Sequence, residues 1–231
     1  MKVVILAGGL GTRLSEETVV KPKPMVEVGG KPILLHIMAR YYHYGFKDFV
    51  IACGYKQEYI LDYFVNQTWN INAVFLDTGL ETNTGGRIKR CAEHIGNKPF
   101  LLTYGDGVGT INIPDTIRFH TQMERLVTVT AVHPPARFGN MIVSDGEATS
   151  FMEKSQMEKG YINGGFFIVE PEAINYIHND DTSWEYEALP RLAKDGQLAA
   201  YKHEGFWQCM DTMHDVRTLN QMYEDGAPWL K

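Results

Sequence analysis

The sequence predicts an α/β fold in which a mixed, mainly parallel sheet is covered by helices on both faces. Over the first 132 residues, apolar runs of strand length alternate with segments of helical periodicity, an order typical of parallel strands. After residue 139 the pattern changes to short runs separated by turn residues, which indicates a partly antiparallel extension of the same sheet. No low-complexity linker or internal repeat divides the 231 residues, so we interpret them as a single domain.

Each expected element follows from a local pattern of apolar and turn-forming residues. Residues 2–7 are β-branched and apolar without alternation, which is typical of a strand buried on both faces. Residues 32–44 place apolar side chains at helical spacing up to Gly45, a residue that suits the end of a helix. The same signals predict further strands at residues 48–53, 73–76, 100–104, 127–132, 141–143, 148–153, 162–169 and 198–203. They predict further helices at residues 58–65, 86–95, 113–124, 171–177, 184–194 and 212–224.

Charge and motif content exclude several classes of function. With a formal net charge of −6, neither nucleic acid nor a membrane surface is expected as a partner, because both select clustered cations. No stretch approaches the roughly 18 apolar residues of a membrane span, and the apolar start is too short for a signal peptide. The three cysteines form no CxxC pair, which suits free thiols and a cytoplasmic location. Neither HExxH nor a serine nucleophile motif occurs, so zinc and hydrolase chemistry are not supported.

The stretch VILAGGLGTRL, which ends at Leu14, turns the first expected strand into a glycine-rich loop. At the carboxyl edge of a parallel sheet such a loop lets backbone N–H groups approach a phosphate, and Arg13 adds a guanidinium suited to the same ligand. The stretch is not a P-loop, and it fails the dinucleotide fingerprint because Leu14 stands where the third glycine belongs. A structural turn would explain the glycines alone equally well. Arg13, together with Lys21 and Lys23, favours an anion site.

Lys23 lies in KPKPM, where the flanking prolines stiffen the backbone and fix the direction of the ammonium group. In isolation such a lysine is most simply a solvated surface charge. Its position ten residues after Arg13, in a loop expected to return to the same edge of the sheet, favours a second phosphate contact.

Two aspartates follow apolar stretches and could hold a divalent cation. Asp106 follows the strand at 100–104 in YGDG, and Asp211 ends FWQCMD. Carboxylates beside phosphates suit Mg²⁺, which usually takes one or two protein carboxylates together with phosphate oxygens. Asp106 is also explained by a simple Asp-Gly turn, and Asp211 by capping of the last helix.

Two later motifs suit a sugar phosphate. FMEKS places Glu153 and Lys154 side by side, which would serve one ligand only if the strand ends there, and a surface charge is the simpler interpretation. INGGFF places Asn163 and two glycines in an apolar strand, which indicates a bulge or a close backbone approach. The Asn163 amide is both donor and acceptor, as sugar hydroxyls require.

Taken in order, these stretches resemble the sugar-phosphate nucleotidylyltransferases, and most closely the bacterial glucose-1-phosphate cytidylyltransferase branch. The motifs that carry the resemblance are AGGLGTRLSEET, KPKPMVEVGGKPIL, DTG, TGGRIKR, LTYGDGV, RFG, EKS, INGGFF and FWQCMDT, and they span nearly the whole chain. The resemblance implies a doubly wound, Rossmann-like nucleotide-diphospho-sugar transferase fold with strands added for the sugar. Within one domain, residues 1–135 would form mainly the nucleotide-binding half and residues 136–231 the sugar-phosphate-binding and closing half.

The resemblance also implies a reaction and its site residues. CTP and α-D-glucose 1-phosphate would give CDP-glucose and pyrophosphate, with Mg²⁺ as the cofactor. Arg13 and Lys23 would be catalytic, and Asp106 and Asp211 would bind the metal. The nucleotide would contact Leu6, Ala7, Gly8, Gly9, Gly11, Thr12, Arg13, Lys23, Gly85, Gly86, Arg87 and Asp106. The sugar phosphate would contact Gly139, Glu153, Lys154, Asn163 and Gly164.

One departure from the family bears on these expectations. Only twelve residues separate Phe64 from Asp77, where the members that the chain resembles carry a markedly longer segment. The difference bears on the homo-oligomer that the resemblance implies and on the identity of the sugar or base. Two alternatives therefore stay open: another sugar or polyol phosphate or another nucleoside triphosphate, and a nucleotide-sugar-binding subunit without activity.

Overall fold

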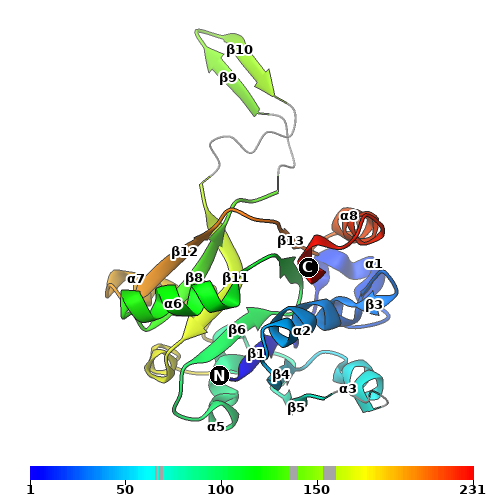
Figure 1. The fold of residues 1–231 in the computed structure, drawn as a ribbon, viewed down its shortest axis with the longest axis vertical. Coiled ribbons are helices and arrows are strands. Elements are labelled where there is room, and N and C mark those ends of the chain that lie inside the picture. The colour runs from blue at the N-terminus through cyan, green and yellow to red at the C-terminus, as the bar shows by residue number, and fades with distance from the viewer. Residues whose placement is uncertain (66, 68–69, 136–139, 153–159) are drawn as a thin grey trace.

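The computed structural model describes residues 1–65, 67, 70–135, 140–152 and 160–231. Its centre is a seven-stranded sheet in the order β12-β8-β11-β6-β1-β4-β5 (Figure 1). β11 runs antiparallel to both of its neighbours, whereas the other strands share one direction. The strands are β1 (Val3–Leu6), β4 (Asp48–Cys53), β5 (Asn72–Asp77), β6 (Phe100–Tyr104), β8 (Val127–Val132), β11 (Ile162–Val169) and β12 (Leu198–His203). The predicted mixed, mainly parallel sheet is confirmed.

The helices are mostly those that periodicity predicts. They are α1 (Ser15–Thr18), α2 (Ile33–His43), α3 (Gln57–Val65), α4 (Thr84–Arg90), α5 (Ala92–Ile95), α6 (Ile113–Met123), α7 (Leu189–Lys194) and α8 (Met213–Glu224). Short 3-10 turns are η1 (Thr12–Leu14), η2 (Lys23–Met25), η3 (Pro171–Tyr176) and η5 (Pro228–Leu230), and η4 (Trp184–Ala188) is a π turn. The helix predicted over residues 86–95 is therefore two helices, and the one over 184–194 begins as a π turn.

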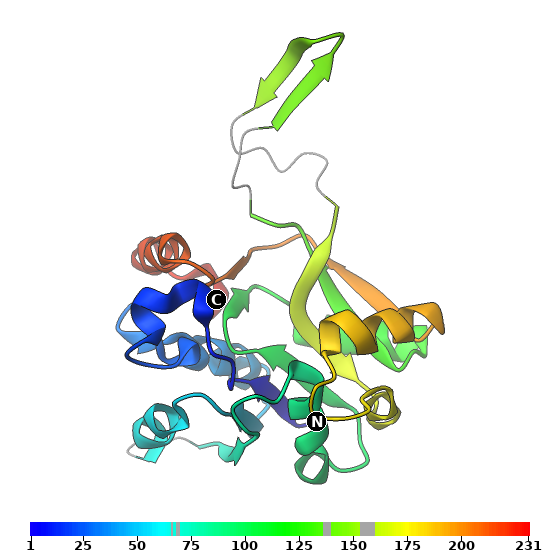
Figure 2. The same ribbon diagram turned by 180° about the vertical axis from the view of Figure 1, so that it is seen from behind.

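Helices cover both faces of the sheet, and β1 shows why. Val3 and Ile5 face one core cluster, to which α2 and α8 contribute. Val4 and Leu6 face a second cluster, to which α4 and α7 contribute. Because successive residues of a strand point to opposite faces, a sheet covered on both sides requires a continuous apolar run. Figure 2 shows the same layers from behind.

The order of the strands reverses at β1. From β1 the chain continues to β4 and β5 on one side, and it returns with β6 on the other. Both β4 and β6 pair with β1 in parallel, so the loops after β1 and β6 leave the same edge of the sheet side by side. In open α/β sheets this reversal point is where ligands bind.

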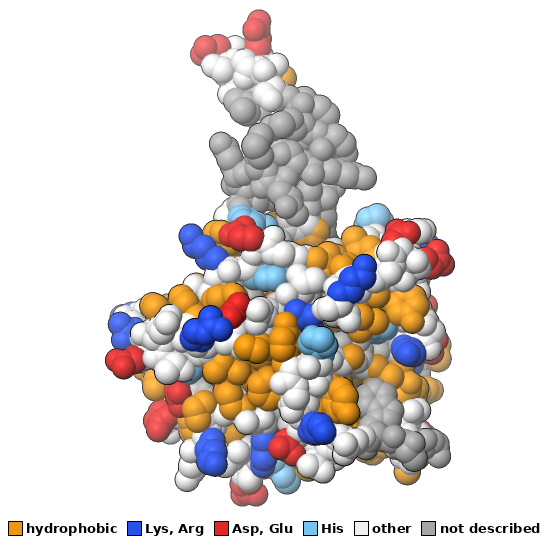
Figure 3. All heavy atoms as spheres, viewed as in Figure 1, with side chains coloured by type: hydrophobic (Ala, Val, Ile, Leu, Met, Phe, Trp, Pro, Cys, Tyr) orange, Lys and Arg blue, Asp and Glu red, His pale blue; other side chains and the backbone are white. Residues whose placement is uncertain are grey.

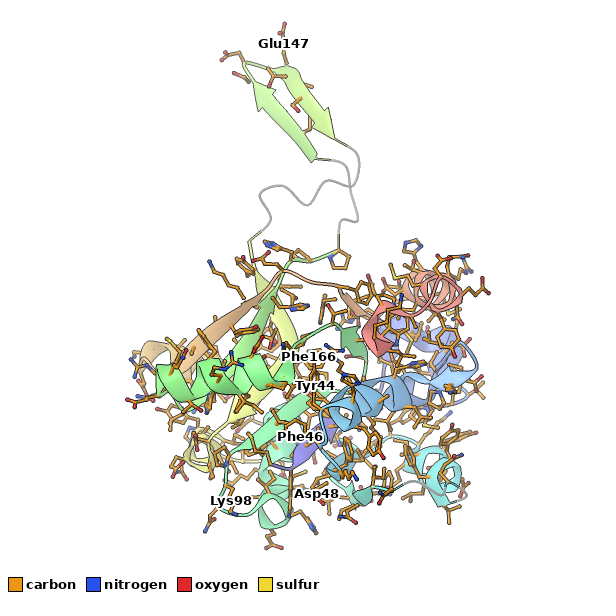
Figure 4. All side chains as sticks on the ribbon, in the orientation of Figure 1. Tyr44, Phe46, Asp48, Lys98, Glu147 and Phe166 are labelled. Atoms are coloured by element: carbon orange, nitrogen blue, oxygen red, sulfur yellow. The ribbon has the colours of Figure 1, made fainter. Side chains whose placement is uncertain are left out.

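The region after residue 139 departs from the prediction in one respect. β9 (Asn140–Ser144) and β10 (Glu147–Met152) pair with each other as a separate hairpin and do not extend the central sheet. β11 lies inside the sheet between β8 and β6, because its apolar end is buried. In Figure 4, Phe166 of β11 lies in the interior, whereas Glu147 lies at the far end of the hairpin. The mixed character of the sheet thus comes from β11 alone.

The surface agrees with the composition. No helix in the described part of the chain is long and apolar enough to cross a membrane. On the face in Figure 3, basic side chains are interspersed with acidic and apolar ones and do not gather into one field. This face therefore offers no extended basic surface to a polyanion.

Candidate active site

The glycine-rich loop between β1 and η1 is in close contact with neighbouring segments. A side chain on Gly8 would lie 2.1 Å from a guanidinium nitrogen of Arg87, so glycine is required there. Gly11 has a φ of +64°, the left-handed conformation that glycine tolerates, and a side chain there would lie 3.1 Å from Cβ of Lys23. Leu14, which breaks the dinucleotide fingerprint, is only 1% exposed and packs in the core. Leu14 thus anchors the loop.

The loop lines a cleft of about 520 Å³ at the carboxyl edge of β1 and β6. Other parts of the lining come from residues 80–84 and from Tyr104. Gly85 and Gly86 are not among the lining residues, because they pack against the backbone of Thr182 and Asp180 at the start of α4. Of the residues predicted to bind the nucleotide, the cleft brings together Leu6, Ala7, Gly8, Gly9, Gly11, Thr12, Arg13, Lys23, Arg87 and Asp106.

Charged side chains meet where the cleft reaches the end of β6. The Lys23 ammonium lies 2.6 Å from Oδ2 of Asp106 and 2.6 Å from Oδ1 of Asp211. Arg13 donates from Nη1 to Oδ2 of Asp211 at 2.9 Å. The predicted pair of carboxylates and the predicted pair of cations therefore form one cluster.

Burial and charge oppose each other in this cluster, and charge prevails. Burial alone would lower the pKa of Lys23, but the charge and hydrogen bond of Asp106, followed by those of Asp211, raise it above its ordinary value. Burial alone would raise the pKa of Asp211, but the hydrogen bond and charge of Lys23, with the charge of Arg13, lower it. Lys23 and Asp211 therefore both stay charged around neutral pH.

A pair of short strands brings Asp211 next to Asp106. β7 (Gly107–Gly109) directly follows Asp106 and pairs antiparallel with β13 (Trp207–Cys209), with Gly107 opposite Cys209. The Met210 N–H then donates to the Asp106 carbonyl at 2.8 Å. Sequence patterns predicted neither strand, because each has only three residues and is specified by the other.

Asp211 does not cap the last helix. The N-cap of α8 is Thr212, whose side chain forms a capping box with Asp215. The Asp211 carboxylate instead accepts from Lys23 and Arg13. Of the two roles left open by the sequence, the geometry excludes capping of the last helix.

Arg87 is a buried cation at the side of the cleft. Its acceptors are the carbonyls of Cys53, Gly79 and Leu80 and the hydroxyl of Thr78. Burial, followed by the charge of Arg90, lowers the pKa of Arg87. The guanidinium thus fixes the backbone that leads from β5 into residues 80–84 of the cleft lining.

A second cavity of about 280 Å³ adjoins the first. Arg13, Tyr104 and Asp106 line both cavities and so form their common wall. Asn163 and Gly164, predicted to contact the sugar phosphate, line the second cavity. The other residues predicted for that ligand lie outside the described residues, and they are Gly139, Glu153 and Lys154.

The second cavity also contains residues that were not among the predicted ones. Gly165 has a φ of +77°, and a side chain there would overlap the Tyr104 ring. Trp207 donates from Nε1 to the Gly164 carbonyl at 2.8 Å. The second glycine of INGGFF was a usable signal for the first contact. Trp207 had no such signal, because it reaches the cavity only through the pairing of β13 with β7.

The donor set suits a divalent cation only in the company of phosphates. Among the described residues, no group of three or more His, Cys, Asp or Glu side chains could hold a metal ion. Asp106 and Asp211 offer two carboxylates that face one point, where the Lys23 ammonium lies. Mg²⁺ is commonly bound by one or two carboxylates, with the remaining positions filled by phosphate oxygens and water. The two aspartates fit that pattern.

Known proteins share both the sequence and the fold. Residues 2–226 match the nucleotidyl transferase family model. The glucose-1-phosphate cytidylyltransferase of Salmonella typhi is 49% identical over 255 residues, which cover 99% of this chain and 98% of that protein. The mannose-1-phosphate guanyltransferase of Schizosaccharomyces pombe is 30% identical over 233 residues, covering 96% of this chain and 64% of that protein.

Solved structures extend these similarities. HddC from Yersinia pseudotuberculosis superposes with a TM-score of 0.78 at 27% identity, covering 96% of this chain and 99% of that one. A UDP-glucose pyrophosphorylase superposes with a TM-score of 0.71 at 18% identity, covering 97% and 98%, and it supports the fold. The Salmonella match spans 255 positions, more than the 231 residues of this chain, so that enzyme carries residues without a counterpart here.

Proposed function

The chain belongs to the nucleotidyl transferase family, and from that premise we propose that it is a glucose-1-phosphate cytidylyltransferase. It joins CTP and α-D-glucose 1-phosphate to give CDP-glucose and pyrophosphate. The observation that carries the proposal is the pair of adjoining cavities with Arg13, Tyr104 and Asp106 in their common wall. The larger has a glycine backbone for a nucleotide, and the smaller has polar groups for a sugar. The identities of base and sugar rest on the similarity to the Salmonella enzyme.

The reaction needs charge neutralisation and alignment more than proton transfer. An oxygen of the sugar phosphate attacks the α-phosphorus of CTP, and the bond from that phosphorus to the oxygen of the departing pyrophosphate breaks. The attacking oxygen is already deprotonated at neutral pH, so no general base is required. Holding two anions in line and neutralising the charge that develops is therefore the main task.

Arg13 and Lys23 are placed for that task. Arg13 lines both cavities, so its guanidinium can contact the triphosphate on one side and the sugar phosphate on the other. Lys23 lines the nucleotide cleft, and its backbone is stiffened by prolines. In the free protein, the Lys23 ammonium is held by two carboxylates at 2.6 Å. Two of its three N–H donors are thereby engaged, and the third is available to a phosphate.

We infer that Asp106 and Asp211 hold Mg²⁺ together with the triphosphate. When bound there, the metal ion supplies positive charge to the phosphate oxygens. The inference is supported by two carboxylates that face one point where the two cavities meet, a number that suits Mg²⁺ bound together with phosphates. The same two carboxylates hold the Lys23 ammonium, so metal binding and the position of that ammonium are coupled.

A matrix of nucleotides against sugar phosphates tests the proposed function. Pyrophosphate release would be measured with CTP, UTP, dTTP and GTP, each against glucose, mannose and galactose 1-phosphates and a polyol phosphate, with and without Mg²⁺. We expect the highest kcat/KM for CTP with glucose 1-phosphate. Equal rates with UTP or dTTP would overturn the base assignment, and a better acceptor would overturn the sugar. Tight CTP binding without turnover on any acceptor would instead favour a nucleotide-sugar-binding subunit.

The resemblance also leads us to infer a cytoplasmic homo-oligomer. Of these two inferences, the one on assembly calls first for a test, because the Salmonella enzyme carries residues that have no counterpart here. Light scattering coupled to size exclusion would measure the mass in solution, and a monomer at catalytic concentrations would contradict the inference.

A further inference from the structure

A chain of hydrogen bonds reaches the second cavity from a carboxylate that lines neither cavity. Glu185, in η4, accepts from the Tyr104 hydroxyl through Oε1 at 2.6 Å. The same hydroxyl accepts from Nδ2 of Asn163 at 3.2 Å. Oδ1 of Asn163 accepts from the Gly165 N–H at 2.8 Å. The chain of hydrogen bonds thus runs from Glu185 through Tyr104 in the common wall to Asn163 and Gly165, which line the second cavity.

The groups at the two ends of this chain of hydrogen bonds determine which partner donates at each step. A carboxylate can only accept, so the Tyr104 hydroxyl has to donate its proton to Glu185. The phenol oxygen is then free only to accept, and it therefore faces the amide nitrogen of Asn163. At the other end, the Gly165 N–H can only donate, so it has to face the amide oxygen. Both ends specify the same orientation of the Asn163 amide.

The surroundings hold Tyr104 in place for this role. Its ring packs edge-on against Phe167 at 5.8 Å between centroids, and Gly165 leaves room for it because a side chain there would overlap the ring. Burial, followed by the charge of Glu185, raises the pKa of Tyr104 well above its ordinary value. The hydroxyl therefore keeps its proton for Glu185 at neutral pH.

We propose that Glu185 is a positioning residue for the sugar phosphate, which acts through the Tyr104 hydroxyl to fix the orientation of the Asn163 amide. In that orientation one N–H of Nδ2 is engaged by Tyr104, and the other is available to an oxygen of the sugar phosphate in the second cavity. The inference rests on the proposed function and deepens it, because the ligand is the same sugar phosphate.

A purely structural role for Glu185 makes a different prediction. Glu185 also accepts from Thr84 at 2.6 Å and from Ser183 at 3.1 Å, so it ties η4 to the start of α4. Loss of those bonds alone would lower the Tm and disturb the nucleotide cleft, which Thr84 lines. Glu187 provides a matched control, because it lies in the same turn, accepts from the Ser183 N–H and does not contact Tyr104.

The test compares Tyr104→Phe, Glu185→Leu, the double variant and Glu187→Leu in the full chain. Tyr104→Phe keeps the ring and deletes only the hydroxyl. We expect Tyr104→Phe to raise the KM for the sugar phosphate by about tenfold, with the KM for CTP within about twofold. Glu185→Leu should raise the KM for the sugar phosphate as much and the KM for CTP by less, since it also loses the bond to Thr84 beside the nucleotide cleft. The KM for the sugar phosphate in the double variant should not exceed that of the worse single variant, because both substitutions break the same chain of hydrogen bonds. Glu187→Leu should leave both KM values unchanged while it lowers the Tm, because it loses the bond from the Ser183 N–H and the ion pair with Arg191.

Two outcomes would overturn the proposal. One is an unchanged KM for the sugar phosphate in Tyr104→Phe. The other is a parallel rise of both KM values in Glu185→Leu that follows the loss of Tm. Side-chain amide NMR signals of Asn163 provide a readout without turnover, since the resonance of the engaged Nδ2 proton should shift in Tyr104→Phe. If the wild-type protein shows no turnover with any acceptor, the proposed function fails. The NMR result is independent of turnover: an unshifted Asn163 signal in Tyr104→Phe would show that the chain of hydrogen bonds does not position the amide.

Discussion

The two cavities that meet at Asp106 are built by different kinds of chain segment. The nucleotide cleft is lined mainly by loops that directly follow parallel strands, such as the glycine-rich loop after β1 and Gly105-Asp106 after β6. The second cavity is lined by segments that meet only through long-range pairing, namely β13 with β7 and the start of β11 beside β6 and β8. The common wall is where both kinds of segment contribute.

The two places also differ in the interactions that their side chains make, which are ion pairs in one and neutral hydrogen bonds in the other. Where the two cavities meet, Lys23 and Arg13 face carboxylates, so a lost charge leaves an uncompensated one behind. In the second cavity, the contacts of Gly164 and Asn163 are single neutral hydrogen bonds. Substitutions in this charged cluster should therefore cost much more activity than substitutions of the neutral groups in the second cavity.

The largest effect is expected for Lys23→Met. The variant removes a cation from the reacting phosphates, and kcat should fall by about 10³-fold. It also frees the oxygens of Asp106 and Asp211, so the nucleotide-free protein should bind Mn²⁺ more tightly than the wild type does. Rate measurements and an EPR titration with Mn²⁺ would check both results.

Lys21→Met is the matched control for that variant. Lys21 lies in the same proline-stiffened segment, but its ammonium is 3.6 Å from Glu27 and touches neither aspartate. It should change neither the Mn²⁺ affinity nor kcat by more than about threefold. A Lys23→Met protein that binds Mn²⁺ no better than the Lys21→Met protein would contradict the coupling of Lys23 to the metal site.

Asp211 and Asp215 lie four residues apart, and we expect Asp211→Asn to affect mainly activity and Asp215→Ala mainly stability. Asp211→Asn removes a charge beside Lys23 and Arg13, so kcat should fall by about 10²-fold with little change in Tm. Asp215→Ala removes the capping box with Thr212, so it should lower the free energy of unfolding by about 1–2 kcal/mol. Thermal melts and steady-state rates on both variants would show the separation. A large loss of Tm in Asp211→Asn would contradict this assignment and indicate that Asp211 mainly stabilises the fold.

How far the sequence could predict each cavity follows from the same difference. The central strands, Arg13 and Lys23 were predictable, because apolar runs and turn residues act locally and a parallel sheet brings successive loops to one edge. The separate β9–β10 hairpin was not, because a short turn-rich stretch does not specify which sheet it joins. Trp207 and Glu185 were missed for a similar reason. Trp207 depends on a three-residue strand pair, and Glu185 on a π turn whose partners are 81 and 101 residues away.

Gly8→Ala and Gly9→Ala should distinguish two reasons why the nucleotide loop needs glycine. A side chain on Gly8 would overlap Arg87, so this variant should lower the Tm by several degrees and raise the KM for CTP by about tenfold. A Cβ on Gly9 would meet nothing within 4 Å beyond its neighbours in the chain, so that variant should keep the wild-type Tm. Its added methyl group would extend into the cleft, and only the KM for CTP should rise. A parallel loss of Tm in both would show that the loop needs glycine for its backbone alone.

The smallest effect is expected in the second cavity, for Trp207→Phe. The substitution keeps an aromatic ring but removes the Nε1 donor to the Gly164 carbonyl. One neutral hydrogen bond is worth about 0.5–1.5 kcal/mol, so the KM for the sugar phosphate should rise by roughly two- to tenfold and the KM for CTP should not. Trp229→Phe is the matched control, because Trp229 donates to His36 in the buried core and should lower the Tm without changing either KM. If Trp207→Phe raised both KM values equally, Gly164 would be coupled to the nucleotide cleft, and the two cavities would have to be treated as one binding site.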